Sequence, residues 1–261
     1  MRLTLNISPC PNDTFMFDAI VNRRIDIAPF EFDVRYLDIE QLNAAVLEGG
    51  PAISKISYAV LPAITDRYRV LDSGSALGRG NGPLLVSRGE VDPHEAGLRV
   101  AVPGMHTTAN ALMRKLFPKV ADKEPMLFSD IAEAVECGAV DAGVLIHEGR
   151  FTYAARGLQL VADLGVEWER ATGLPLPLGA IVADRSLPAE VFEAFEELLR
   201  RSIEYAFANP MTSREYVKEH ARELADDVID SHINLFVNQF SLSLGSEGRR
   251  AVTELTGLAE F

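Results

Sequence analysis

Two successive series of alternating strands and helices constrain the fold of this chain more than any other feature of its sequence. Runs rich in strand-forming residues, such as RLTLNIS and PAISKIS, are separated by helical patterns such as IEQLNAAVLEGG. The alternation starts again at LRVAV and continues with PMLFS, DAGVLIH, LQLVADL and LGAIVAD as further predicted strands. Strands separated by helices favour a mainly parallel sheet that is covered on both faces. The sequence therefore predicts an α/β fold built from two such series.

A helical tail follows the second series. From Leu187 onward the pattern is almost wholly helical, with PAEVFEAFEELLRRSIEYAFA as its longest stretch. We expect this tail to pack back on the first series, so that the second series forms an inserted lobe. The predicted lobes are residues 1–90 with 185–261, and residues 91–184. Two chain crossings between lobes would form a hinge, and the cleft between the lobes is then the natural ligand site.

Composition excludes several classes of partner. The chain has 261 residues, of which 48% are hydrophobic, so it can bury a substantial core. Its formal net charge of -13, with no stripe of Lys and Arg, argues against binding nucleic acid. It contains no apolar run near the ~20 residues that a bilayer crossing needs, so no membrane insertion is expected. The sequence does not indicate an oligomeric partner.

The cysteines and the start of the chain indicate the compartment. Cys10 and Cys137 give neither a disulfide framework nor a cysteine metal spacing, and reduced thiols are the simpler interpretation. The opening MRLTLNISPCPNDTF contains no apolar run long enough for a signal peptide. We therefore expect a cytoplasmic protein.

Ligands of open α/β sheets bind at the carboxyl ends of strands, and that rule selects four loops. They are Ser8–Thr14, Ser57–Tyr58, Pro103–Thr108 and His147–Arg150. Two of them lead into predicted helices, whose first N–H groups and positive dipole end favour anions. The sequence therefore predicts a site for a small carboxylate substrate.

The polar residues of these loops each allow a structural interpretation as well. Asn12 or Asp13 is predicted to cap the helix that follows the first strand. Thr107 and Thr108 have hydroxyls that can donate to a carboxylate, but Thr107 could equally serve only as a helix cap. Lys55 either attracts an acid or simply extends into solvent.

His147 is the strongest candidate for chemistry. It follows the buried-looking run AGVLI and so lies at the carboxyl end of a predicted strand. An unperturbed imidazole, with a pKa near ~6.5, is largely neutral in cells and can accept a proton. The alternative is a structural histidine that bonds a loop carbonyl. No Walker motif, His-Glu-x-x-His motif or complete dinucleotide fingerprint occurs, and no metal site is predicted.

Several blocks of the sequence together resemble the 1,4-dihydroxy-6-naphthoate synthase family, lyases of the futalosine route to menaquinone (vitamin K2). The blocks run in the expected order over nearly the whole chain: SPCPNDTFMF, KISY, GSALGRGNGPLLVSRG, VAVPGMHTTA, DAGVLIHEGRFTY, LPLPLGAI and VNQFSL. One departure is Gly149, where the HESRFTY form of the block has serine; it leaves His147 in place.

The resemblance implies a fold similar to the two-lobed periplasmic binding proteins of type 2. It implies conversion of cyclic dehypoxanthine futalosine to 1,4-dihydroxy-6-naphthoate, without a metal or an organic cofactor. The general base of the family matches His147. Its substrate-binding stretches match Lys55-Ile56-Ser57 and Thr107-Thr108.

The candidate substrate-binding residues are thus Lys55, Ile56, Ser57, Thr107 and Thr108, with Asn12 and Asp13 from the first block. The hypothesis is that this set holds and orients the substrate while its hydroxyls and backbone N–H groups bind the carboxylate. His147 then removes a proton, a C–C bond to the former ribose portion breaks, and the product becomes aromatic.

The alternative is a non-catalytic solute-binding protein of the same fold that carries a small acid. Such a protein would have an export signal, or a lipidated cysteine after an apolar segment, and Cys10 has no such segment before it. A ligand-sensing regulatory domain would need a DNA-binding helix-turn-helix segment in addition.

Overall fold

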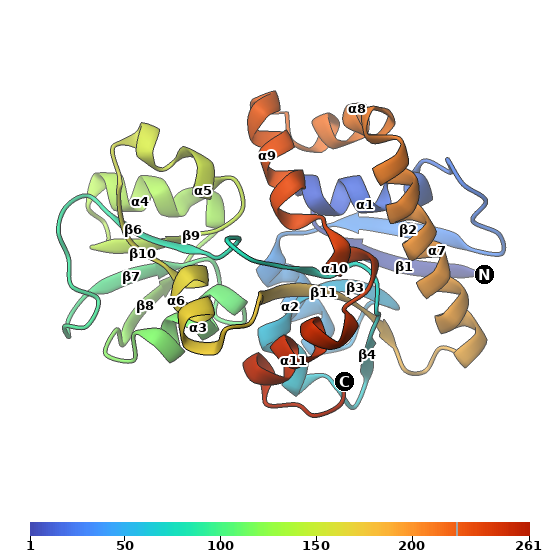
Figure 1. Cartoon of the computed structure of the whole chain (residues 1–261), viewed down its shortest axis with the longest axis horizontal. Coiled ribbons are helices and arrows are strands. Elements are labelled where there is room, and N and C mark those ends of the chain that lie inside the picture. Colours follow the sequence, from blue (N-terminus) through green and yellow to red (C-terminus); the bar gives the residue numbers. More distant parts are fainter. Residues whose placement is uncertain (223) are drawn as a thin grey trace. The chain divides into compact units, whose positions relative to one another are not determined.

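A computed structural model shows two compact units, and it describes residues 1–222 and 224–261. The first unit comprises Met1–Gly78 and Pro177–Phe261, and the second comprises Arg79–Leu176. Each unit has its own sheet, helices and hydrophobic core (Figure 1). The second unit is therefore inserted between the two segments of the first.

The first unit is built from strands and helices at both ends of the chain. Its first segment contains β1 (Arg2–Ile7), α1 (Pro11–Val21), β2 (Glu31–Tyr36), α2 (Ile39–Glu48), β3 (Ile53–Ser57), the 3-10 helix η1 (Tyr58–Ala63), β4 (Tyr68–Val70) and β5 (Ala76–Gly78). Its second segment contains β11 (Leu176–Asp184), α7 (Ala189–Ala208), α8 (Pro210–His220), α9 (Asp226–Phe236), α10 (Gln239–Leu242) and α11 (Gly245–Thr256).

The sheet of the first unit is mixed, with the strand order β2-β1-β3-β11-β4, and β5 also pairs with β11. Strand β1 runs parallel to β2 and β3, whereas β11 runs antiparallel to β3 and β4. The prediction of a mainly parallel sheet is thus wrong for β11. A strand that returns after an inserted unit has no crossover helix from its neighbour to fix its direction.

Helix α1 is buried over nearly its whole length. Every residue from Pro11 to Ile20 is buried, and α1 packs against α7, α8 and α9. The helix begins at Pro11, whose ring fixes a helical φ, and its N-cap residue is Cys10, without a side-chain cap. The prediction that Asn12 or Asp13 caps this helix is therefore wrong: both lie inside its first turn.

The second unit contains a five-stranded mixed sheet with the order β10-β6-β9-β7-β8. Its elements are β6 (Leu84–Ser87), β7 (Arg99–Val102), α3 (Thr108–Leu116), β8 (Asp122–Pro125), η2 (Phe128–Asp130), α4 (Ile131–Cys137), β9 (Ala142–Leu145), α5 (Gly149–Thr152), η3 (Ala154–Arg156), β10 (Gln159–Asp163) and α6 (Leu164–Thr172). The predicted strand PMLFS is misplaced, because the strand there is the polar edge segment DKEP, set by pairing with β7.

The chain passes between the units earlier than the sequence pattern suggested. The crossings lie at Gly78/Arg79 and Leu176/Pro177, whereas the predicted lobe boundaries were 90/91 and 184/185. Strand β6 belongs to the second sheet because it pairs with β9 and β10, and β11 belongs almost entirely to the first because it pairs with β3 and β4.

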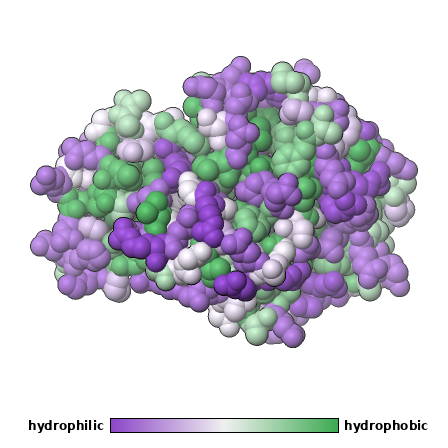
Figure 2. Space-filling view, viewed as in Figure 1, coloured by the Kyte–Doolittle hydropathy of each residue, from purple (hydrophilic) through white to green (hydrophobic). Residues whose placement is uncertain are grey.

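Apolar and hydrophilic side chains are intermixed over the face shown in Figure 2. Individual large apolar side chains are exposed, including Leu160 at 47% and Met211 at 74%. Among the described residues, no helix combines the length and the apolar character that a membrane span requires.

Candidate active site

Lys55 and Asp13, which the sequence selected from two separate strand ends, meet in the first unit. Nζ of Lys55 lies 2.9 Å from Oδ1 of Asp13. Both side chains are buried, with Asp13 fully so and Lys55 5% exposed. The interpretation of Lys55 as a solvated surface lysine is therefore excluded, since its ammonium is held inside the unit.

The Asp13 carboxylate is satisfied on both oxygens. Its Oδ2 accepts hydrogen bonds from the backbone N of Ser8 at 3.1 Å and from the Ser8 hydroxyl at 2.8 Å. Its Oδ1 accepts from Nδ2 of Asn12 at 2.8 Å as well as from Lys55. A buried charge needs such partners, because its desolvation is otherwise too costly. Asp13 thus fixes the position of the Lys55 ammonium.

Gly179 makes room for the Lys55 side chain. It lies on β11, where it pairs with Ser57 of β3. A Cβ atom at this position would lie 2.7 Å from the carbonyl oxygen of Ile56 and 3.0 Å from Cε of Lys55. The sequence did not single out this residue, although a glycine inside a strand is a recognised sign of close approach.

Ser57 is held by a residue that the sequence did not select. Nδ2 of Asn43, on α2, donates to Oγ of Ser57 at 3.0 Å, and the Ser57 backbone N donates to Oδ1 of Asn43 at 2.8 Å. Both residues are buried. A hydroxyl that accepts one hydrogen bond still has its own proton to donate. Ile56, which lies between Lys55 and Ser57 on β3, is fully buried.

Thr107 and Thr108 form the start of α3 in the second unit. Oγ1 of Thr107 accepts from the backbone N of Asn110 at 3.3 Å and donates to the carbonyl of Gly104 at 2.8 Å. Thr107 is thus the N-cap of α3, and Thr108 is its first residue. The first N–H groups of a helix have no partner within the helix, so this turn favours an anion.

His147 lies just beyond the end of β9, as the sequence predicted. It is half-buried, and its φ of 52° is left-handed, a conformation that few residues other than glycine adopt. Its ring meets the ring of Phe128 edge-on, with centroids 5.2 Å apart. Burial raises the pKa of the adjacent Glu148 carboxyl. Strained backbone of this kind is concentrated at functional sites.

Arg150 anchors the loop that carries His147. Its Nη1 donates to the carbonyl of Gly82 at 2.5 Å, and its Nη2 lies 2.6 Å from Oδ2 of Asp163. The other oxygen of Asp163 caps α6, accepting from the backbone N of Gly165 at 2.9 Å. Arg150 is only 17% exposed. This ion pair therefore ties the turn after β9 to a helix start.

The predicted site residues fall into two groups, one in each unit. Asn12, Asp13 and Lys55 are in direct contact in the first unit, where Ser57 is held separately by Asn43. A further histidine belongs to the first group: Nε2 of His232 lies 3.1 Å from Oδ1 of Asn12. His232 lies on α9, in the helical tail, far from Asn12 in the sequence.

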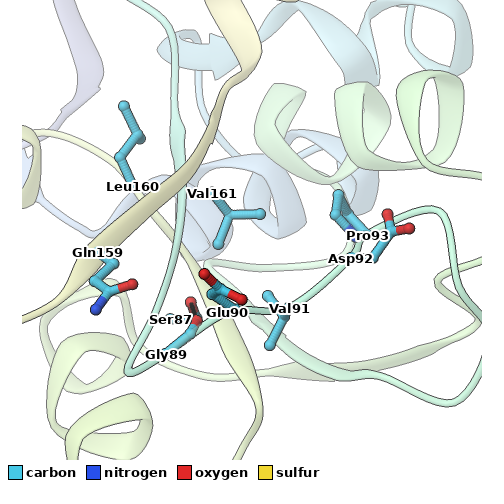
Figure 3. A pocket seen from close by; sticks show the side chains of 9 residues that line it. All are labelled: Ser87, Gly89, Glu90, Val91, Asp92, Pro93, Gln159, Leu160 and Val161. Atoms are coloured by element: carbon cyan, nitrogen blue, oxygen red, sulfur yellow. Dashed lines mark hydrogen bonds between the residues drawn. The ribbon is translucent and has the colours of Figure 1, made fainter.

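Metal-binding clusters and the pocket of the second unit were the other places where a site could lie. In residues 1–222 and 224–261, no three His, Cys, Asp or Glu side chains are grouped so that they could hold a metal ion. The second unit has an open pocket of about 490 Å³ (Figure 3). It is lined by Ser87, Gly89, Glu90, Val91, Asp92 and Pro93 and by Gln159, Leu160 and Val161 of β10. None of the predicted site residues lines that pocket.

Comparison with known proteins identifies close relatives of the chain. A family model described as menaquinone biosynthesis matches residues 3–260. A 1,4-dihydroxy-6-naphthoate synthase of Thermus thermophilus is 48% identical over 99% of this chain and 94% of its own length. An enzyme of the same name from Streptomyces coelicolor is 45% identical over 97% of this chain and 91% of its own length.

Solved structures confirm the predicted fold class. A crystal structure of a protein from Archaeoglobus fulgidus matches with a TM-score of 0.89 and 35% identity, covering 97% of this chain and 95% of that one. A Candida albicans protein described as having the generic periplasmic binding protein fold matches with a TM-score of 0.69 and 12% identity, covering 100% and 92%. The chain therefore has the two-lobed α/β fold of the periplasmic binding proteins.

Proposed function

Since this chain belongs to the menaquinone-biosynthesis family and is a carbon–carbon lyase that forms 1,4-dihydroxy-6-naphthoate, we propose that its substrate is cyclic dehypoxanthine futalosine and that His147 is its general base. The position of His147 supports the proposal best: an imidazole follows a buried strand, on a left-handed turn that Arg150 anchors. No cofactor is part of the proposed reaction.

In this proposal the neutral imidazole of His147 takes a proton from the bound substrate. The electron pair of the bond to that proton forms a new π bond on the departing former ribose portion as its C–C bond to the ring breaks, and the pair of the broken C–C bond passes into the ring, which becomes aromatic. Aromatisation favours the products, so the protein needs to supply orientation, one base and the exclusion of water. A positioned base contributes about 10²–10⁴-fold to the rate.

Lys55 and Ser57 supply the proposed carboxylate contacts of the first unit. One N–H of the Lys55 ammonium points to Asp13, and an ammonium has two more to donate. The Ser57 hydroxyl, already accepting from Asn43, can donate its proton. Ile56 lies between Lys55 and Ser57 on β3, and Asn12 and Asp13 contribute by holding the Lys55 ammonium in place.

Thr107 and Thr108 supply the proposed contacts of the second unit. Thr107 fixes the start of α3 as its cap, and Thr108 stands at the first position of that helix. Both are buried, and the Thr107 hydroxyl already donates to the Gly104 carbonyl, so a carboxylate bound there would accept from the first N–H groups of the helix.

The test is turnover of cyclic dehypoxanthine futalosine by the purified chain, with the naphthoate product followed by chromatography and mass spectrometry. Wild-type protein is expected to form the product, and His147→Ala to lose about 10²–10⁴-fold in kcat. His94→Ala, at an exposed histidine of the same unit, is the matched control and is expected to behave as wild type. Near-wild-type turnover by His147→Ala would exclude the proposed base.

The competing function is a receptor that binds a small acid without changing it. Turnover of the precursor separates the two: a receptor would bind a small acid, which calorimetry measures, but would form no 1,4-dihydroxy-6-naphthoate from the precursor. Because a biosynthetic enzyme acts where its substrate is made, we also expect the protein in the cytoplasm.

A further inference from the structure

A contact between the helical tail and the first turn of α1 stands out among the buried polar groups of the first unit. His232, on α9, is fully buried, and its Nε2 lies 3.1 Å from Oδ1 of Asn12, which is 220 residues earlier in the chain. Asn12 in turn contacts Asp13, the partner of Lys55. The tail thus reaches the Lys55 ammonium through two intermediate side chains.

The donor and acceptor properties of these groups determine which group donates in each hydrogen bond. The Asp13 carboxylate accepts the bond from Asn12, so the amide group that faces it at 2.8 Å is the NH₂ of Asn12. The amide oxygen then faces His232, and because an amide oxygen only accepts, Nε2 of His232 carries a proton. His232 donates to Asn12, and Asn12 donates to Asp13.

The direction matters because Asn12 and Lys55 share one acceptor. Oδ1 of Asp13 accepts from Nδ2 of Asn12 at 2.8 Å and from Nζ of Lys55 at 2.9 Å. Rotation of the Asn12 amide by half a turn would set its oxygen against the carboxylate, and the carboxylate and its lysine would have to move. The N–H of His232 opposes that rotation by bonding the amide oxygen.

We propose that His232 is a positioning residue for the Lys55 ammonium. It fixes the Asn12 amide, and through Asn12 and Asp13 it sets where Lys55 meets the substrate carboxylate. The inference rests on the proposed substrate-binding role of Lys55. It goes beyond that role by assigning a function to a helical-tail residue that reaches Lys55 through Asn12 and Asp13.

A purely structural role for His232 makes a different prediction. The ring also lies 4.6 Å from the ring of Phe236, centroid to centroid, and α9 packs against α1. If His232 only fills space there, an apolar side chain would replace it, and a polar one would impair the protein. If it positions Lys55, the donor rather than the bulk decides the outcome.

The experiment compares His232→Gln with His232→Leu in the full chain. Glutamine keeps an N–H donor close to the place of Nε2, whereas leucine keeps the volume without the donor. KM and kcat for cyclic dehypoxanthine futalosine are measured separately, with thermal unfolding beside them. His220→Leu is the matched control, because this tail histidine bonds the carbonyl of Tyr216 and not the Asn12 amide.

His232→Leu is expected to raise KM about tenfold with little change in kcat, the equivalent of one lost hydrogen bond. His232→Gln is expected to stay within about twofold of wild type. A folded His232→Leu protein with wild-type KM overturns the inference. Equal impairment of both variants also overturns it, since restoring an N–H donor with glutamine would then make no difference.

A measurement without substrate separates this inference from the proposed function. Heteronuclear NMR of the Lys55 side chain reports the surroundings of its ammonium, and we expect His232→Leu to shift that signal and His232→Gln to leave it. If wild-type protein fails to turn over the precursor, the proposed function fails, and the Lys55 signal still decides the inference. An unchanged signal in His232→Leu counts against it.

Discussion

Nζ of Lys55 lies 2.9 Å from Oδ1 of Asp13, and this buried pair joins β3 to the first turn of α1. Neither partner can be removed alone at low cost, because the other would remain as a buried charge without its counter-ion. The pair is therefore both part of the proposed substrate site and part of what holds the first unit together.

Removal of either charge is expected to destabilise the protein strongly. Lys55→Met and Asp13→Asn should each lower the free energy of unfolding by about 3–5 kcal/mol, because each leaves one unpaired buried charge. The double variant should lose clearly less than the sum of the two, since no lone charge remains. Urea unfolding of the four proteins measures this cycle, and strict additivity would show that the pair is not coupled.

Gly179→Ala is expected to disturb Lys55 from the opposite strand. The added Cβ would lie 2.7 Å from the Ile56 carbonyl oxygen and 3.0 Å from Cε of Lys55, so strand and side chain must both move. We expect a loss of about 1–3 kcal/mol of stability and a raised KM. Gly50→Ala is the control, because its Cβ would meet only Ala45 at 3.7 Å. An unchanged KM for Gly179→Ala would mean that Lys55 tolerates displacement.

Arg150→Met is expected to lower kcat by misplacing His147. The change removes the bonds from the guanidinium to Gly82 and Asp163 and so frees the turn after β9. A shift of about 1 Å in a reacting group can cost about 10²-fold in rate. Arg150→Lys is not expected to restore it, since an ammonium cannot span both partners.

The control for Arg150 is Arg156→Met, which removes a more exposed ion pair with Glu136 in the same unit. Exposed pairs contribute about 0–1 kcal/mol, so activity should be kept. Stopped-flow or steady-state kinetics compare the two variants. If Arg150→Met and Arg156→Met have similar kcat values, the anchoring of the His147 turn by Arg150 does not contribute to catalysis.

The sequence predicted the α/β class, the inserted second unit and most strands, because alternation and periodicity are local signals. It also placed His147 correctly at a strand end, since the strand AGVL and the turn after it are continuous in the chain. The direction of β11 was wrong, because pairing between segments far apart in the sequence decides it.

The supporting residues of the site could not be found in the same way. Asn43, Gly179 and His232 lie on a helix, a strand and the tail, and each acts only by meeting a residue remote from it in the chain. Nothing in the local pattern around His232 distinguishes it from a surface histidine on an amphipathic helix. Its burial and its contact with Asn12 in the structure do so.

Glu148 should give the protein a pH-dependent stability of known sign. Burial raises the pKa of its carboxyl above the ordinary value of 4.5, so the folded protein holds this proton more tightly than the unfolded chain. Its contribution to stability is then fully present below that ordinary value and is lost as the pH rises through the raised pKa. Glu148→Gln removes the titrating group, so its stability relative to wild type should rise with pH over this range.

Glu136→Gln provides the opposite case in the same unit. The hydrogen bond from Arg156 lowers the pKa of Glu136, so its contribution is present above the ordinary value of 4.5 and is lost as the pH falls through the lowered pKa. Urea unfolding of both variants and wild type, at a series of pH values from below 4.5 up to neutral, should therefore give difference curves of opposite slope. A flat curve for Glu148→Gln would show that this carboxyl, although adjacent to His147, is solvated as well in the folded protein as in the unfolded chain.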